Sequence, residues 1–365
     1  MARTISWLID TLESSKSLPC FFPWTQLEER SDDGDFKTCC WSNQILGKAP
    51  KNSPVDILSI WRSEHVGTLQ RDMIDGRLPS SCPTTCPVIG WRSEYCKDSF
   101  YRYRGSEYAQ FSSHFRRNRR KVLQALVDRR EPNGTYPLRL KLHPSSICNL
   151  RCAMCNLDKT RRFQGTNQYY RDRLNTLMPY LEELKLFGGE PFACKETRSI
   201  IFGDSLTRHP QVHLSMITNG TMLHGSVLER LRHLRLGWFE VSLDSCTAST
   251  YHKARGLPQV PLPFQHFETF VALRDSGGLR IVKIFASFVI QGVNVHEVGD
   301  FVRYTKQLNV TPVFTVVHGS DELMPPLESL RENLLDGIAV AETVGSIDGR
   351  ECLLHLLRQL PDGPG

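Results

Sequence analysis

Three cysteines within eight residues offer the clearest chemistry in this sequence. Cys148, Cys152 and Cys155 follow the pattern C-x3-C-x2-C. Thiolates at this spacing can bind one metal centre from a single loop, and four-iron clusters are held by cysteine thiolates. Three thiolates leave one iron of such a cluster without a protein ligand, and an open coordination position is a place for chemistry. The alternative is a zinc or disulfide knot, but a zinc site would need a fourth ligand nearby, and none lies close.

The cysteine content as a whole points to metal rather than to disulfides. The chain has 365 residues, 12 of them cysteine, with 40% hydrophobic and 23% charged residues, an ordinary soluble composition. We find no apolar run long enough to cross a membrane and no signal peptide, so we expect a cytoplasmic protein. Clustered cysteines in such a protein indicate metal or iron–sulfur sites. Six lie between residues 20 and 96, three in the loop, and Cys194, Cys246 and Cys352 stand alone. This grouping predicts two clusters plus isolated thiols.

The elements that must position the loop follow from an alternation of strands and helices after residue 137. We expect strands at 138–142, 184–187, 213–217, 238–243, 281–290 and 312–317. Helices are expected at 168–182, 195–207, 225–234, 262–275 and 295–308. This alternation indicates an α/β fold, a partial (β/α)6 TIM-like barrel with a parallel sheet. Active sites of such folds form at the carboxyl ends of the strands. The cysteine loop follows the first of these strands.

The rest of the chain suggests four segments. Residues 1–100 are predicted to form a small cysteine-rich domain with little regular structure beyond a helix at 1–15. A metal cluster would help to hold so small a core together. Residues 101–136 form a basic helical connector, 137–320 the barrel, and 321–365 a C-terminal helical cap.

The cysteine loop and the motifs that follow it resemble the radical S-adenosylmethionine (radical SAM) superfamily. Gly188-Gly189-Glu190-Pro191, after the second strand, is similar to the family's GGEP motif. The resemblance implies a [4Fe-4S] cluster on Cys148, Cys152 and Cys155, with SAM bound to the open iron. It also implies reductive cleavage of SAM to a 5′-deoxyadenosyl radical that abstracts a hydrogen atom from a substrate. The cofactors carry the difficult step, while the protein orients them and excludes water.

The same resemblance assigns SAM contacts to individual residues. Gly188, Gly189 and Glu190 hold the methionyl amino group, because glycines permit close backbone approach and a carboxylate pairs with an ammonium group. The remaining predicted contacts are Met154 against adenine, Asn219, Ser242 and Asp244 near the ribose or methionine moiety, Arg255 at the carboxylate of SAM, and Asn294 near adenosine.

The N-terminal cysteines resemble the SPASM/twitch module of radical SAM enzymes, which binds an auxiliary [4Fe-4S] cluster. The resemblance rests on Cys20-Phe-Phe-Pro-Trp24, on Cys39-Cys40 after Asp33-Gly34, and on Cys82-Pro-Thr-Thr-Cys86. It implies Cys20, Cys39, Cys82 and Cys86 as ligands, with Cys40 or Cys96 as possible replacements. The segment departs from the usual pattern in preceding the barrel and in having three residues between its last two cysteines. An iron-free or zinc-bound module is the alternative.

Cys246 is the predicted catalytic thiol. It lies two residues after Asp244, where relatives more often have Asp-Gly-Ala. A thiol at this rim can donate a hydrogen atom to a substrate radical, as in radical SAM epimerases. The alternative is a buried, inert side chain. Cys194 and Cys352 are predicted to be structural.

The predicted function is therefore hydrogen abstraction from a small polar metabolite such as a sugar or aminocyclitol, with epimerisation as the preferred reaction. No segment looks able to grip a leader peptide. Peptide maturation and alcohol dehydrogenation, with the auxiliary cluster as electron acceptor, are the alternatives. A flavodoxin or ferredoxin is the expected reductant.

The net charge of +6 also raises a non-catalytic RNA-binding metalloprotein as a remote alternative. Its support is the basic run from Arg116 to Arg130. Because Val122, Leu123 and Leu126 interrupt that run, we interpret it as the exposed face of a helix. Neither nucleic acid nor membrane is an expected partner.

Overall fold

The computed structural model describes residues 4–14, 20–30, 33–50, 53–84, 86, 100–155, 157, 168–256 and 262–361. The chain divides into two compact units that interleave along the sequence. The first unit comprises Met1–Ser145, Phe163–Leu186 and Ser199–Leu214, and the second comprises Ser146–Arg162, Phe187–Arg198 and Ser215–Gly365. The described part of the cysteine-rich segment belongs to the first unit together with two of the predicted barrel strands. The predicted division into four segments stays a prediction.

Among the described residues, the strands that lie wholly in the first unit have the order β3-β2-β1-β4-β5. They are β1 (Gln26–Glu29), β2 (Asp35–Lys37), β3 (Gly47–Lys48), β4 (Arg139–Leu142) and β5 (Glu183–Leu186). β1 pairs with β4 and β4 with β5 in parallel, whereas β2 is antiparallel to both β1 and β3. The N-terminal segment therefore carries more regular structure than its sequence predicts. Strands of two to four residues are too short for an alternating pattern to reveal them.

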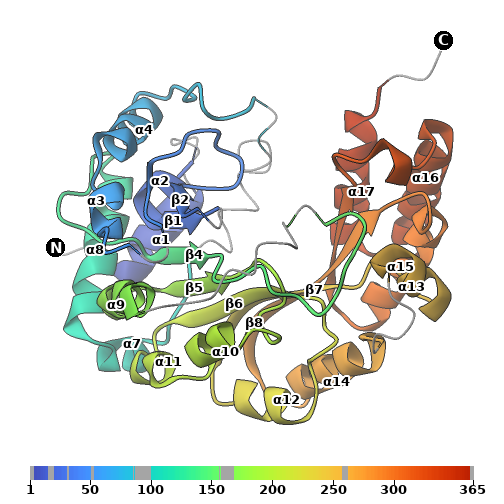
Figure 1. The fold of residues 1–365 in the computed structure, drawn as a ribbon. Helices are drawn as coiled ribbons and strands as arrows, with labels where there is room; N and C mark the ends of the chain where they lie inside the picture. Colours follow the sequence, from blue (N-terminus) through green and yellow to red (C-terminus); the bar gives the residue numbers. More distant parts are fainter. Residues whose placement is uncertain are drawn as a thin grey trace. The chain divides into compact units, whose positions relative to one another are not determined.

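The helices of the first unit pack around this sheet (Figure 1). They are α1 (Ile5–Ser14), α2 (Phe22–Thr25), α3 (Ile57–Trp61), α4 (Glu64–Ile74), α7 (Gly105–Gln110), α8 (Ser113–Val127), α9 (Gln168–Leu177), the 3-10 turn η1 (Met178–Tyr180) and α11 (Asp204–Arg208). The basic run lies largely on α8, which buries Phe115, Val122 and Leu123 against the core. Its exception is Arg119, which is buried and forms an ion pair with Glu182 at 2.9 Å. Most of this run is the amphipathic helix that the sequence predicts.

The second unit contains the parallel strands β7 (Arg235–Ser242), β8 (Arg280–Ile290) and β9 (Thr311–Val316). β6 (His213–Thr218) begins in the first unit and ends in the second. All six strands predicted after residue 137 are present, each within three residues of the expected bounds. The sequence identifies them because each has apolar residues at alternate or successive positions and is followed by a loop or turn. The parallel strand core confirms the predicted α/β class.

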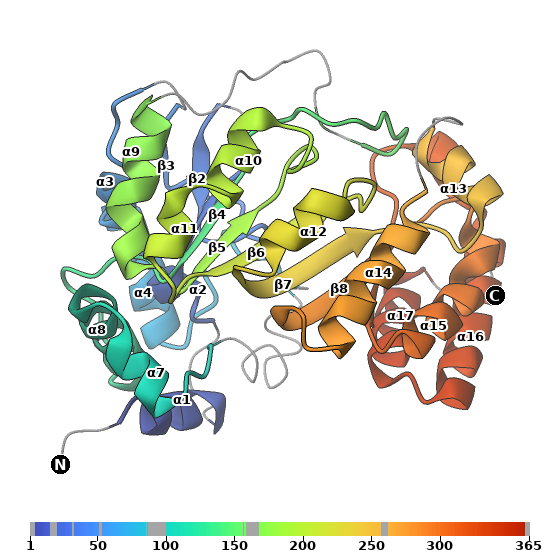
Figure 2. The same ribbon diagram turned by 90° about the horizontal axis from the view of Figure 1, so that it is seen from below.

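Helices follow these strands, with α14 packed on β8 and α15 on β9 (Figure 2). The helical elements are α10 (Lys195–Ile201), α12 (Gly225–Leu231), α13 (Ala248–Arg255), α14 (Phe264–Asp275), η2 (Val295–Glu297), α15 (Val298–Gln307), η3 (Asp321–Leu323), α16 (Leu327–Val344) and α17 (Ile347–Gln359). α16 and α17 match the predicted C-terminal helical segment. Within the described residues, no helix combines the length and the apolar character needed to span a membrane.

Candidate functional site

A cavity of about 220 Å³ lies in the second unit, where the cysteine loop meets the ends of its strands. Eleven of the predicted site residues line it: Cys148, Cys152, Met154, Cys155, Gly188, Gly189, Glu190, Asn219, Ser242, Asp244 and Arg255. Five further lining residues were not predicted: Leu150, Leu157, Ile217, Thr218 and Val289. Ile217 and Val289 are each the second-to-last residue of a strand. The alternation of side chains between the two faces of a strand is the signal by which they could have been found. The cavity therefore joins three thiols, two carboxylates, one guanidinium group and an apolar wall.

The three thiols of the loop differ in exposure. Cys148 is exposed, Cys155 is half-buried and Cys152 is buried. Burial raises the pKa of Cys148, whereas the backbone N–H of Leu150, 3.4 Å from its sulfur, lowers it. In the described part of the chain, no three His, Cys, Asp or Glu side chains converge as ligands of one metal ion. A four-iron cluster does not need such convergence, because each thiolate binds a different iron. The donor set of this loop therefore fits a cluster better than it fits a single zinc ion.

Gly189, in the turn that follows β5, lies against the cysteine loop of the same unit. A Cβ atom at this position would lie 2.1 Å from the carbonyl oxygen of Ile147, so only glycine fits. The next residue, Glu190, donates its backbone N–H to the same carbonyl oxygen at 2.8 Å. Gly188 has a φ of 123°, a conformation that favours glycine. The Gly-Gly pair is thus required by a close backbone approach.

The Glu190 carboxylate is bound inside the protein. It accepts hydrogen bonds from the Thr218 hydroxyl at 2.8 Å and from the backbone N–H groups of Asn219 and Phe192 at 2.8 Å and 3.2 Å. Burial raises its pKa, although these donors oppose the shift. Glu190 therefore holds the turn after β6 in place. Its contact with the amino group of SAM stays a prediction.

Asn219 connects that turn to the cysteine loop. Its amide group donates to Asn149 Oδ1 at 2.9 Å and lies 3.9 Å from the sulfur of Cys148. The Thr221 hydroxyl donates to Asn219 Oδ1 at 2.6 Å and accepts from Asn149 Nδ2 at 2.9 Å. Asn149 and Thr221 were not predicted, because Asn149 lies about 70 residues from both of its partners, Asn219 and Thr221. This triangle of polar side chains fixes the position of Cys148.

Arg255 and Asp244 form a buried ion pair beside the loop. Their atoms Nη2 and Oδ2 lie 2.8 Å apart, and Asp244 is fully buried. Burial raises the pKa of Asp244, while Arg255 lowers it. Burial lowers the pKa of Arg255, but Asp244 and the Cys152 sulfur raise it by more, so the guanidinium stays charged. Arg255 also lies 3.5 Å from the Cys152 sulfur. The pair therefore places a fixed positive charge beside a predicted cluster ligand.

The backbone at Asp244 is unusual and supports this arrangement. Asp244 has a φ of 58°, which is uncommon for a residue other than glycine and often marks functional sites. Its Oδ1 accepts the N–H of Val289 at 2.8 Å. Asn294, fully buried, donates to the carbonyl oxygens of Asp244 and Val289, both at 2.9 Å. Asn294 does not line the cavity; it supports the turn that presents Asp244.

Cys246 also lies outside the cavity lining. Its backbone N–H donates to Glu297 Oε2 at 2.6 Å. Burial, with Glu297 and Asp300 nearby, raises the pKa of its thiol to about 12. The structure thus places this thiol near η2 and the start of α15. A role as hydrogen donor stays a prediction.

The first unit brings together the four other predicted ligands. Cys20, Cys39, Cys82 and Cys86 pack into one apolar core with Phe21, Trp24 and Phe100. Burial raises the pKa of Cys20 well above its usual value, and Cys39, Cys82 and Cys86 all lie near enough to raise it further. Four neighbouring thiols in an apolar core fit a buried cluster. The possible replacement Cys40 is exposed, and Cys96 lies outside the described residues.

Known protein sequences resemble the part of the chain that contains the cavity. Residues 142–305 match the Radical SAM superfamily. The GTP 3′,8-cyclase of Clostridium acetobutylicum is 26% identical over 205 residues, which cover 55% of this chain and 59% of that protein. A probable GTP 3′,8-cyclase of Archaeoglobus fulgidus is 29% identical over 181 residues, 48% of this chain and 57% of that protein. The chain therefore spans less than two thirds of the length of these relatives.

Solved structures show a more distant similarity. SuiB of Streptococcus suis bound to S-adenosylmethionine is 16% identical, with a TM-score of 0.45 over 70% of this chain and 58% of that chain. The protein anSMEcpe with bound AdoMet is 17% identical, with a TM-score of 0.44 over 56% of this chain and 59% of that chain. Similarities at this level do not bear on the reaction.

Proposed function

Because residues 142–305 form a radical SAM domain, we propose that this protein is an enzyme that binds a [4Fe-4S] cluster and SAM in the second unit. Once bound and reduced by one electron, these cofactors would cleave SAM to methionine and a 5′-deoxyadenosyl radical, the group that takes a hydrogen atom from a C–H bond of the substrate. The observation that carries the proposal is the cavity that joins the three loop thiols to Glu190, Asn219 and Arg255.

Each group around the cavity has a role in this proposal. Cys148, Cys152 and Cys155 would hold three irons as thiolates. Arg255 would offset the negative charge of the thiolate at Cys152 and keep the loop in place, since it bridges to Asp244. The apolar side chains of Met154, Leu157, Ile217 and Val289 would exclude water from the reacting atoms.

The test is anaerobic reconstitution with iron and sulfide, followed by reduction in the presence of SAM. We expect formation of 5′-deoxyadenosine and methionine by the reconstituted protein. A reconstituted protein that binds iron at the loop yet leaves SAM intact under strong reduction would contradict the proposal.

We further propose that the substrate is a small polar metabolite and that the reaction is an epimerisation with Cys246 as hydrogen donor. Support comes from the position of Cys246 two residues after the Asp244 turn. Reaction in D2O should place one solvent deuterium at the inverted carbon, and Cys246→Ala should abolish inversion while hydrogen abstraction continues. Normal amounts of inverted product from Cys246→Ala would refute this assignment.

A two-electron oxidation is the second candidate, whether of an alcohol or of a peptide. The four neighbouring thiols of the first unit favour it, because an auxiliary cluster held by Cys20, Cys39, Cys82 and Cys86 would be an electron acceptor. About eight irons per reconstituted chain would support that second cluster, and about four would argue against it. If the reaction is an oxidation, the oxidised product formed in D2O should contain no deuterium from the solvent.

We assign the reduction of the SAM-binding cluster in the cell to a flavodoxin or a ferredoxin. The test is to replace the chemical reductant in the SAM cleavage assay with either protein.

A further inference from the structure

A transverse row of charged side chains crosses the sheet of the first unit near the carboxyl ends of its parallel strands. Glu28 of β1 is the partner of Lys37 on β2 and of Lys141 on β4, and Lys141 is the partner of Lys185 on β5. Paired residues on neighbouring strands point to the same face of a sheet. One face therefore presents three lysines and one glutamate side by side. We call these four residues the lysine row.

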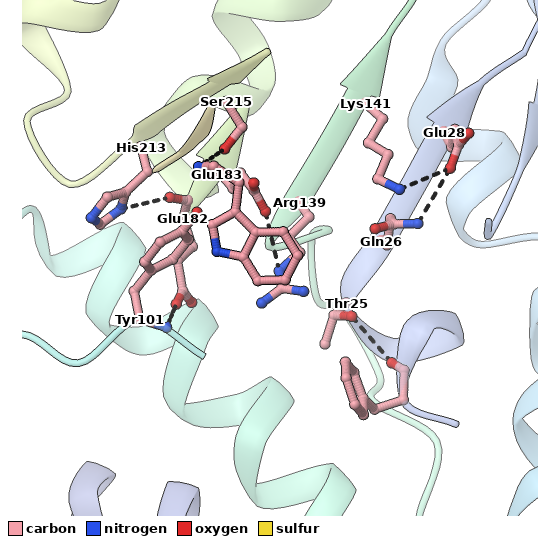
Figure 3. Close-up of polar contacts among 12 residues, drawn as sticks. Thr25, Gln26, Glu28, Tyr101, Arg139, Lys141, Glu182, Glu183, His213 and Ser215 are labelled. Carbon is pink, nitrogen blue, oxygen red and sulfur yellow. Dashed lines mark hydrogen bonds and ion pairs between the residues drawn. The ribbon is translucent and has the colours of Figure 1, made fainter. Parts of the chain in front are cut away.

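The charges of the lysine row do not balance. Glu28 is buried and lies 3.3 Å from Lys141 Nζ, toward which that lysine extends (Figure 3). The same carboxylate also binds Arg30 at 2.8 Å, so it is shared between two cations. Among the described residues, neither Lys37 nor Lys185 forms an ion pair, and the Lys37 ammonium group donates only to the carbonyl oxygen of Ser42 at 2.9 Å. The lysine row therefore has three positive charges and one negative charge, a net charge of +2, although Glu183 also acts on Lys141.

The neighbouring row of the same face is different. Two residues earlier along the strands, Gln26, Arg139 and Glu183 are partners across β1, β4 and β5. Arg139 and Glu183 form an ion pair at 3.5 Å, so this row is neutral. The excess of positive charge is therefore confined to the end of the sheet at which parallel α/β folds bind ligands.

Electrostatic surroundings place Lys185 near the other cations. Around the Cys40 thiol, Lys141, Arg30 and Lys185 act as positive neighbours and Glu28 as a negative one. Lys141 and Lys185 are half-buried, which limits the solvent that can screen their mutual repulsion. Like charges directly opposite each other on neighbouring strands destabilise a sheet unless an anion lies between them.

We propose that Lys141 and Lys185, assisted by Lys37 and Arg30, bind an oxyanion, either a phosphate or a carboxylate group of a small-molecule ligand. The ammonium groups would donate charge-assisted hydrogen bonds to its oxygens. Glu28 keeps Lys141 and Arg30 extended toward the same place. The site belongs to the first unit alone, so it does not depend on the proposed function of the second unit.

Binding of inorganic pyrophosphate and of citrate to the reconstituted full chain tests the proposal. We expect saturable binding by calorimetry, weakened by added salt, and a raised melting temperature. Stronger binding of pyrophosphate would identify phosphate as the preferred group, and stronger binding of citrate would identify carboxylate. The absence of saturable binding of both anions at low ionic strength would overturn the proposal, whatever the outcome of the SAM cleavage assay.

Three variants locate the binding. Lys185→Met should weaken pyrophosphate or citrate binding by roughly tenfold or more, a loss of about 1.4 kcal/mol. Without an anion, its melting temperature should be unchanged or higher, because the substitution removes the repulsion between Lys141 and Lys185. Lys48→Met is the matched control, since Lys48 lies on β3 of the same sheet, is exposed and pairs with Asp35; it should bind normally. Glu28→Gln should bind the anions more tightly, because the amide oxygen can still accept hydrogen bonds from Lys141 or Arg30 but no longer repels an anion. Unchanged binding by Lys185→Met, or loss of binding by Lys48→Met alone, would refute the assignment.

Discussion

The two groups of cysteines in this protein sit in opposite kinds of surroundings. Cys148, Cys152 and Cys155 lie in one short loop at a cavity, beside a guanidinium group and polar side chains. Cys20, Cys39, Cys82 and Cys86 come from distant parts of the N-terminal segment and lie in an apolar core with aromatic side chains. A polar, accessible loop suits a cluster that must bind a ligand at an open iron. Four buried or half-buried thiols in an apolar core suit a cluster that supports the fold or transfers electrons. The following predictions would break or sharpen this contrast.

The largest effect is expected for Cys152→Ser. Loss of this ligand should abolish 5′-deoxyadenosine formation and remove about four irons per chain. If the second cluster forms, its iron should be retained. Iron analysis together with the SAM cleavage assay measures both effects. Cys352→Ser is the control, because Cys352 lies on α17 and its sulfur contacts the backbone of Phe314. Full SAM cleavage by Cys152→Ser would contradict the proposal that the loop cysteines, rather than those of the first unit, hold the cluster that binds SAM.

The second-largest effect on SAM cleavage is expected for Gly189→Ala. The added methyl group would meet the backbone carbonyl of Ile147, which cannot move aside as a side chain can. The resulting displacement of the cysteine loop should lower the rate of SAM cleavage by about 100-fold. Gly105→Ala, at a position where an added Cβ has no neighbour within 4 Å, should leave the rate unchanged. Equal rates for the two variants would show that the close approach is not needed.

Cys39→Ser tests the other group. This residue is buried, so the polar hydroxyl should lower the free energy of unfolding by about 1–3 kcal/mol and, if the second cluster forms, remove about four irons per chain. SAM cleavage without substrate should persist. Cys40→Ser is the matched control. Cys40 is next to Cys39 in the sequence but is exposed, so it should be replaceable without loss of iron. If Cys40→Ser lost iron and Cys39→Ser retained it, Cys40 rather than Cys39 would be assigned as the ligand.

The smallest effect is expected for Thr221→Val. This change removes the hydroxyl that links Asn149 to Asn219 while it conserves the shape of the side chain. We expect a loss of about 1 kcal/mol in unfolding free energy and a severalfold fall in SAM cleavage, measured by denaturation and product analysis. Thr343→Val, whose hydroxyl bonds to its own helix at Ala339, should change neither quantity.

Much of the second unit could be predicted from the sequence because its signals are local. Each strand after residue 137 has apolar residues at alternate or successive positions and is followed by a loop or turn. The cysteine loop directly follows the first of these strands. Eleven predicted residues meet at one cavity because the carboxyl ends of parallel strands lie at one edge. Local spacing and strand direction were sufficient to place these residues.

Other features follow only from contacts between distant parts of the chain. The pairing of β1 with β4 joins residues more than 100 positions apart. Together with the pairing of β4 with β5, it aligns Glu28, Lys141 and Lys185 into one row. The same kind of long-range contact links Asn149 to Thr221 and turns Cys246 toward Glu297. By itself the sequence determined the strand–helix order and the cysteine loop. The tertiary structure decided which strands pair, in which register, and therefore which side chains face one another, because register depends on packing that no local pattern records.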